Sequence, residues 1–248
     1  MARIVIDAGH GGRDYGAVYE GRREKDDNLR LAMLVGDILK QNGVDVVYTR
    51  TSDVYNTPLE KARMGNEAGA DYFVSIHRNA FPTPNTVSGV ETLVYNDSGV
   101  KAEMARNINS NLEQLGFVNL GVKERPDLAV LRRTQIPALL VEAGFIDSNI
   151  DNELLDRNYE AVARAIADGI LETIQPEVPY YKVQVGLFRN ENNANRLLEQ
   201  LVSEGFPAYI NYADGYYKVL VGAFQDLAQA RDQEQRLRDY GYETVVVR

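Results

Sequence analysis

The chain has 248 residues, of which 44% are hydrophobic and 25% charged, with a formal net charge of −9 and no cysteine. These values are typical of a globular protein with enough apolar residues for a core, and the lack of cysteine excludes disulfides and thiolate metal ligands. Because an acidic chain repels phosphate backbones, we expect no nucleic-acid partner.

The N-terminal segment, MARIVIDAGHGG, lacks the charged and apolar regions and the cleavage site of a signal peptide. No stretch approaches the roughly 20 apolar residues that a membrane-spanning helix requires. We therefore expect synthesis in the cytoplasm and no membrane insertion.

Strands and helices are predicted to alternate through residues 1–175. Apolar periodicity predicts strands over 2–6, 44–49, 72–76, 89–95 and 137–141, and helices over 26–41, 98–115 and 152–174. A further helix begins at TPLE, with Thr57 as N-cap, Pro58 at the first helical position and Glu60 completing a capping box. The alternation, with nearly continuous apolar strands, predicts a three-layer α/β domain with a mostly parallel twisted sheet.

A second domain is predicted after a short linker at 176–180, where two prolines interrupt the chain. YKVQVGLF (181–188) and YKVLVGAF (217–224) are two copies of one pattern, and the similarity continues beyond them at a constant offset. Each copy reads as strand, helix, strand. Residues 181–248 are therefore expected to form a small ferredoxin-like βαββαβ domain.

Three apolar runs in the first domain end in a residue that can bind a metal. IVIDAGH ends in His10, YFVSIH in His77 and PALLVE in Glu142, and the chain has no other histidine. Because the carboxyl ends of parallel strands meet at one edge of the sheet, these side chains are predicted to share a site. For either histidine alone, a hydrogen-bonded loop residue is the ordinary alternative.

Two imidazoles need a third ligand to hold zinc, and two histidines with one glutamate form a known catalytic set. Glu24 stands directly before the first helix, where an acidic residue is also favoured by the helix dipole. Spacing alone leaves five carboxylates open: Asp7, Asp14, Glu20, Glu24 and Glu142.

The glycines of AGHGG also suggest an anion-binding loop. Their order does not fit G-x-G-x-x-G, and no Lys-Ser/Thr pair follows as in a P-loop. No G-x-S-x-G segment marks a serine nucleophile. Phosphate binding and serine-based acyl transfer are therefore poorly supported.

Four segments in order, DAGHGGRDYGA, EKDDNL, FVSIHRNA and LRRTQIPALLVEAGFIDS, resemble the signature blocks of the zinc-dependent N-acetylmuramoyl-L-alanine amidases. The repeats VQVGLF and VLVGAF resemble the SPOR domain, a peptidoglycan-binding module. The resemblance implies a peptidoglycan hydrolase with one Zn²⁺ per chain. Its reaction would cleave the amide between N-acetylmuramic acid and the L-alanine of the stem peptide.

By the same resemblance, His10, Glu24 and His77 are the zinc ligands and Glu142 is the catalytic general base. Asp7 and Ser75 are candidates for holding the free nitrogens of the histidines. The glycines beside His10 would let a long polymer approach the metal.

Three further residues are candidates for substrate binding. Arg78, directly after His77, and Arg133 would contact carboxylates or carbonyls of the substrate, with a plain surface charge as the alternative for each. In the SPOR domain, strand alternation places Gln184 on the open face of the sheet together with Lys182, Lys218 and Leu220. By resemblance that face binds glycan strands.

Some relatives carry an extra helix that covers the zinc site until a partner removes it. Residues 78–88 are few and include two prolines, so we expect no such helix and no need for an activator protein. Without a signal peptide, the enzyme would act on the wall after cell lysis or release by a non-classical route. A non-catalytic wall-binding protein and a zinc carboxypeptidase are the alternative functions.

Overall fold

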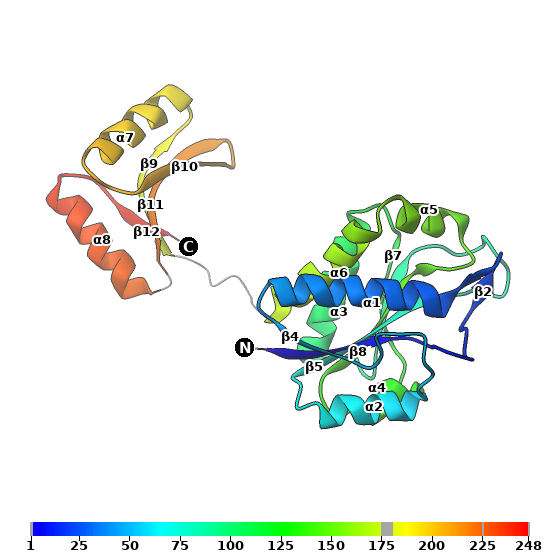
Figure 1. The fold of residues 1–248 in the computed structure, drawn as a ribbon. Coiled ribbons are helices and arrows are strands. Elements are labelled where there is room, and N and C mark those ends of the chain that lie inside the picture. Colours follow the sequence, from blue (N-terminus) through cyan, green and yellow to red (C-terminus); the bar gives the residue numbers. More distant parts are fainter. Residues whose placement is uncertain (1, 175–180, 225, 248) are drawn as a thin grey trace. The chain divides into compact units, whose positions relative to one another are not determined.

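The computed structural model describes residues 2–174, 181–224 and 226–247. The chain divides into two compact units, Met1–Pro176 and Glu177–Arg248, each of which is drawn in Figure 1. The linker expected at 176–180 lies outside the described residues. Among the described helices, none is long and apolar enough to cross a membrane.

The first unit is built on a six-stranded sheet with the strand order β4-β1-β5-β8-β6-β7. All neighbouring strands are parallel except β6 and β8, which are antiparallel, so the predicted mostly parallel sheet is confirmed. The strands are β1 (Arg3–Ala8), β4 (Asp45–Tyr48), β5 (Tyr72–Asn79), β6 (Val90–Val94), β7 (Asn119–Glu124) and β8 (Ala138–Phe145).

Helices cover both faces of this sheet, which confirms the three-layer arrangement (Figure 1). One face packs against α1 (Glu24–Gln41), α3 (Gly99–Glu113) and α6 (Tyr159–Ile174), through residues such as Leu31, Ile108 and Ile166. The other face, which includes Phe73 and Leu140, packs against α2 (Pro58–Glu67) and the short α4 (Ala129–Arg133). The candidate active site lies on this second face.

The predicted element boundaries hold in some places and fail in others. The capping box of Thr57 and Glu60 is present at the start of α2. The helix predicted over 152–174 is instead two helices, α5 (Asn149–Arg157) and α6, because Asn158 leaves the helical conformation with φ −158° and ψ 81°. Four elements were not predicted: β7, α4, and the strands β2 (Val18–Tyr19) and β3 (Arg22–Arg23), which form a hairpin.

The second unit is a βαββαβ domain, as predicted. Its antiparallel sheet has the order β10-β11-β9-β12, and its core is formed by residues such as Val183, Val221, Leu201 and Leu237. Its elements are β9 (Tyr181–Phe188), α7 (Glu191–Ser203), β10 (Ala208–Ala213), β11 (Tyr216–Phe224), α8 (Leu227–Asp239) and β12 (Val245–Val247).

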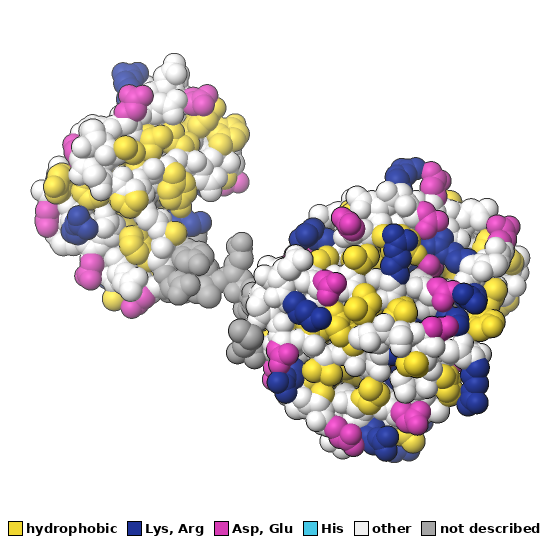
Figure 2. Space-filling view, viewed as in Figure 1, with side chains coloured by type: hydrophobic (Ala, Val, Ile, Leu, Met, Phe, Trp, Pro, Cys, Tyr) yellow, Lys and Arg dark blue, Asp and Glu magenta, His cyan; other side chains and the backbone are white. Residues whose placement is uncertain are grey.

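Charged side chains of both signs are interspersed on the surface of the first unit. On the face shown in Figure 2, Lys and Arg side chains alternate with Asp and Glu across that unit. The described atoms in this view form no extended basic surface of the kind that tracks a nucleic-acid backbone.

Candidate active site

His10 lies in the loop that leaves β1 at the carboxyl edge of the sheet. Its backbone has φ +58°, a left-handed conformation that non-glycine residues seldom adopt. Gly9 before it is pressed against the ring of His77, since a Cβ at Gly9 would lie 2.3 Å from that ring. The glycine therefore makes room for the second histidine of the site, which was not the reason expected from the sequence.

Glu24 is the first residue of α1, and this position places its side chain next to His10. Its N–H donates to the carbonyl of Ala17 at 2.9 Å, and its Oε2 accepts the N–H of Ala17 at 2.9 Å. A Cβ at Gly16 would lie 2.4 Å from Oε2 of Glu24 and 2.6 Å from the ring of His10. Gly9 thus borders His77 and Gly16 borders Glu24 and His10, so the two glycines together make room for all three side chains.

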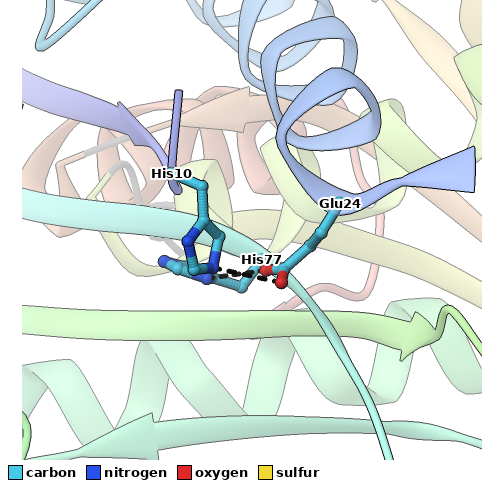
Figure 3. Close-up of side chains that lie close together, drawn as sticks. All are labelled: His10, Glu24 and His77. Carbon is cyan, nitrogen blue, oxygen red and sulfur yellow. Dashed lines mark hydrogen bonds and ion pairs between the residues drawn. The ribbon is translucent and has the colours of Figure 1, made fainter. Parts of the chain in front are cut away.

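His10, Glu24 and His77 point toward one another (Figure 3). Nε2 of His10 lies 3.1 Å from Oε2 of Glu24, and Nδ1 of His77 lies 2.9 Å from Oε1 of Glu24. One donor atom from each residue lies within 4.8 Å of the others. Two imidazole nitrogens and one carboxylate oxygen gathered in this way fit the donor set of a tetrahedral metal site that retains an open position.

The free nitrogen of His10 is held by Asp14. Oδ2 of Asp14 lies 2.9 Å from Nδ1 of His10, and its Oδ1 accepts the N–H of Gly16 at 3.1 Å. Asp14 was one of the open ligand candidates, and in the structure it fixes the orientation of His10, another candidate. Glu20, another candidate, is exposed in the turn between β2 and β3.

Asp7 and Ser75 do not hold the histidines as expected. The Ser75 hydroxyl donates to Asp7 at 2.6 Å, and Thr49 donates to the other oxygen of Asp7 at 2.5 Å. Lys61 forms a buried ion pair with Asp7 at 3.0 Å. The expected role is therefore corrected: Asp7 anchors Lys61 beneath the loop of His10.

Three largely buried cations hold the loop of His10 by its carbonyl groups. Lys61 donates to the carbonyl of Ala8 at 2.6 Å, and Arg50 donates to the same carbonyl at 3.0 Å and to that of Gly9 at 2.9 Å. Lys25 donates to the carbonyl of Gly12 at 2.8 Å. The sequence analysis missed these residues, because nothing in their spacing connects them to the loop.

Glu24 and His10 shift each other's pKa. Burial alone would raise the pKa of Glu24, but hydrogen bonds with His10 and His77 outweigh it and hold the pKa well below its usual range. Burial would lower the pKa of His10, but Glu24 and Asp14 raise it to about 9. A metal ion must therefore displace protons from this site, so its affinity falls as pH falls.

Glu142 stands beside the ligand candidates on β8. It is the register partner of His77 across β5–β8 and of Glu91 across β6–β8. Burial raises its pKa to about 7, and the nearby carboxylates of Glu24 and Glu91 add to the rise. Its Oε2 is buried and has no hydrogen-bond partner within the described parts of the chain. A carboxyl group of this kind can take up and release a proton near neutral pH.

A cavity of about 230 Å³ adjoins the two histidines on the face covered by α2 and α4. Polar groups, among them Asn56 and Lys61, line it together with apolar ones. Its lining residues are Asp7, His10, Asp14, Asn56, Pro58, Lys61, His77, Leu128, Ala129, Val130 and Leu140. It is large enough for a small part of a substrate beside the metal-binding side chains.

The expected substrate role of Arg78 is wrong, because its side chain is 0% exposed. Its guanidinium donates to Asp27 at 2.6 Å, to the carbonyls of Gly144 and Phe145, and to Asn152. A cation held in this way ties β5 to α1 and to the end of β8 and cannot reach a ligand in solution.

Two other candidate residues remain accessible. Arg133, the last residue of α4, is exposed, and its contact with substrate stays a prediction. Gln184 lies between Leu220 and Val245 in the sheet of the second unit and is partly exposed. Leu220, expected on the same face, is only 3% exposed, so it offers little surface to a ligand.

The segment 78–88 carries no helix over the site. After β5 ends at Asn79 the chain forms bends and turns, and Asn85 donates its N–H to the carbonyl of Asp147 at 2.9 Å. The carboxylate of Asp147 accepts the N–H of Phe81. These hydrogen bonds tie the segment to the loop after β8.

The fold places three residues that could hold a metal ion at the carboxyl edge of a parallel sheet, next to a carboxyl group that can exchange a proton, and this arrangement fits a hydrolase. Residues 4–172 match the N-acetylmuramoyl-L-alanine amidase family, and residues 178–248 match the SPOR domain. This chain belongs to the N-acetylmuramoyl-L-alanine amidase family and carries a SPOR domain.

Relatives resemble the chain in sequence and in structure. The amidase CwlM of Bacillus licheniformis is 35% identical over 223 residues, and the sporulation-specific N-acetylmuramoyl-L-alanine amidase of Bacillus subtilis is 34% identical over 224 residues. Each alignment covers 86% of both chains. The crystal structure of an N-acetylmuramoyl-L-alanine amidase from Clostridium difficile 630 has a TM-score of 0.66 at 33% identity and covers 71% of this chain and 98% of its own.

Proposed function

We propose that this protein is a zinc-dependent amidase that hydrolyses the bond between the lactyl group of N-acetylmuramic acid and the L-alanine of the stem peptide. The observation that carries the proposal is the convergence of His10, Glu24 and His77 beside the carboxyl group of Glu142, whose Oε2 is buried. The family match and the amidase relatives support the same reaction.

One Zn²⁺ per chain fits the three ligands, and when bound it supplies Lewis-acid chemistry that polarises a carbonyl and makes water more acidic. Glu142 accepts the proton of the attacking water and delivers it to the departing amine, a role worth roughly 10²–10⁴-fold in rate. Asp14 keeps the ring of His10 in its binding orientation. The cavity on the side of Asn56 and Pro58 receives part of the substrate.

The second unit binds peptidoglycan and so keeps the catalytic unit close to its substrate. The SPOR match supports peptidoglycan as the ligand, and the helix-free face of the sheet, with Gln184 on β9 and Tyr209 on β10, supports binding of glycan strands. Tyr209 is 37% exposed and offers an aromatic ring to a sugar.

We place its action at the cell wall after release from the cytoplasm by cell lysis or a non-classical route. The sporulation-specific relative is consistent with lysis of the mother cell. No activator protein is needed in this proposal, since the described segment 78–88 forms no helix over the site.

Purified full-length protein should be incubated with cell walls while new N-terminal L-alanine is measured. We expect release that stops with a chelator, returns with Zn²⁺ and is lost in Glu142→Ala. Release of C-terminal residues instead would favour a carboxypeptidase, and no release would favour a non-catalytic wall-binding protein. Release that continues in chelator or in Glu142→Ala would overturn the mechanism.

A further inference from the structure

We propose that Lys123, held by Glu91, binds a carboxylate of the stem peptide on the leaving-group side of the scissile bond. Specifically, its ammonium group donates a hydrogen bond to the free α-carboxylate of the second peptide residue. The inference rests on the proposed amidase function and adds a specificity-determining residue to it.

Four neighbouring strands carry a row of polar side chains on one face of the sheet. His77 on β5 is the register partner of Glu142 on β8, and Glu142 is the register partner of Glu91 on β6. Lys123 on β7 pairs with Leu93, and its Nζ lies 2.8 Å from Oε2 of Glu91. The row therefore runs from a metal-ligand candidate, through the acid–base carboxyl group, to a lysine.

The chemistry of the reaction indicates on which side of Glu142 the departing peptide lies. Cleavage of an amide breaks the carbon–nitrogen bond, and the nitrogen leaves with a proton that Glu142 delivers. The departing nitrogen must then lie within hydrogen-bond reach of Glu142. On one side of Glu142 stands His77 with the metal ligands, and on the other stands Glu91. The peptide, which begins at the departing nitrogen, thus has Glu91 and Lys123 as its neighbours.

Lys123 is both anchored and accessible. Its side chain is 51% exposed, whereas that of Glu91 is 12% exposed. Glu91 is itself fixed, because its Oε1 accepts the side-chain N–H of Asn79 at 2.9 Å. An ammonium group has three donors, so the bond to Glu91 leaves others for a ligand. Arg125 is a second cation nearby, but its guanidinium group already donates to both carboxylate oxygens of Asp127.

The substrate presents a matching group close to the scissile bond. The second residue of the stem peptide is a glutamate joined through its side-chain carboxyl group, so its α-carboxylate is either free or converted to an amide. A charge-assisted hydrogen bond from a fixed lysine favours the free carboxylate over the neutral amide. Lys123 would therefore distinguish two chemical forms of the wall.

Binding of two synthetic dipeptides tests the proposal: L-alanyl-D-glutamate with its γ-carboxyl group blocked as an N-methylamide, and the α-amide of the same compound. The full-length protein, with zinc and after chelator treatment, is titrated with each by calorimetry or by NMR. We expect the carboxylate form to bind about tenfold more tightly than the amide. Lys123→Gln should reduce this ratio to about one, and Lys123→Arg, which keeps the charge, should retain a preference for the carboxylate.

The matched control is Lys101→Gln, which removes a lysine on α3 whose Nζ donates to the carbonyl of Ser98. It should leave the ratio unchanged. Equal binding of both dipeptides by the unaltered protein, or a full preference in Lys123→Gln, would overturn the inference. Wall hydrolysis assayed in the same preparations separates the two proposals: activity without the preference refutes only the role of Lys123, whereas inactive unaltered protein refutes the proposed function.

Discussion

Gly16 lies so close to Glu24 that a Cβ at position 16 would approach Oε2 of that carboxylate to 2.4 Å. Gly16→Ala should therefore move Glu24 away from His10 and weaken zinc binding at least tenfold, as measured by competition with a chromophoric chelator. Gly21→Ala is the matched control, because Gly21 also has positive φ but a Cβ there meets nothing within 4 Å. Both variants should lose about 1 kcal/mol of stability, and only Gly16→Ala should lose metal affinity. Equal zinc affinities would show that the close approach is unimportant.

Removal of one ligand should abolish both metal binding and catalysis. In His10→Ala two donors remain, too few for a stable zinc site, so we expect no bound zinc by elemental analysis and no release of N-terminal L-alanine. The second unit has its own core and should stay folded, which NMR spectra of its methyl groups can check. Glu20→Gln, at an exposed turn residue, should retain full zinc content. Stoichiometric zinc in His10→Ala would refute the assigned site.

Arg78 should matter for stability and not for substrate affinity. Arg78→Met would remove the guanidinium donor from the carbonyls of Gly144 and Phe145, of which the latter keeps the N–H of Ser148, and would leave Asp27 with one cation fewer. We expect a loss of roughly 3 kcal/mol in the free energy of unfolding, measured with urea, and an unchanged KM for the remaining folded enzyme. Arg133→Met, at an exposed site, should alter stability by less than about 0.5 kcal/mol. A raised KM with unchanged stability in Arg78→Met would restore the substrate role that we have rejected.

Glu142 should make the metal-free protein less stable at high pH. Its pKa is raised from 4.5 to about 7, so the folded state holds this proton more tightly than the unfolded chain does. The stabilisation is complete below about pH 4.5 and is lost as pH rises through 7. In chelator-treated protein, Glu142→Gln should therefore be more stable than the unaltered chain at pH 8, by up to about 3 kcal/mol, and nearly equal to it at pH 5.

Thermal unfolding at both pH values measures this difference. Glu103→Gln, at an exposed residue of α3, is the control and should show no such pH dependence. A Glu142→Gln protein that gains no stability between pH 5 and pH 8 would mean that the carboxyl group is ionised over this range.

The parts of the fold that could be predicted from the sequence are those with a run of apolar residues or a local capping motif. Apolar runs located the central strands, and the spacing of Thr57 and Glu60 identified the start of α2. The hairpin at residues 18–23 has two residues in each strand, too few to show alternation. β7 lies at the edge of the sheet, and its residues are half-buried or exposed, so they lack an apolar pattern.

Some residues of the candidate site could likewise be predicted from a local sequence signal, and others could not. Both histidines follow directly from strand ends, whereas Glu24 was chosen by family resemblance, because the helix dipole alone also favours a carboxylate at a helix start. Asp14 reaches His10 only because the chain turns back at Gly11 and Gly12, both with positive φ. Arg78 was misjudged because adjacency to His77 along a strand says nothing of burial. Contacts that depend on tertiary packing leave no mark in local spacing.

The loop that presents His10 is bound at its carbonyl groups by Lys25, Arg50 and Lys61, and these bonds need no metal. The chain therefore loses the conformational entropy of this loop when it folds, before an ion arrives. Capture of the ion then requires only its partial dehydration and the displacement of protons, with no ordering of backbone. A loop that is ordered in this way can release and regain a metal ion while the surrounding structure stays folded.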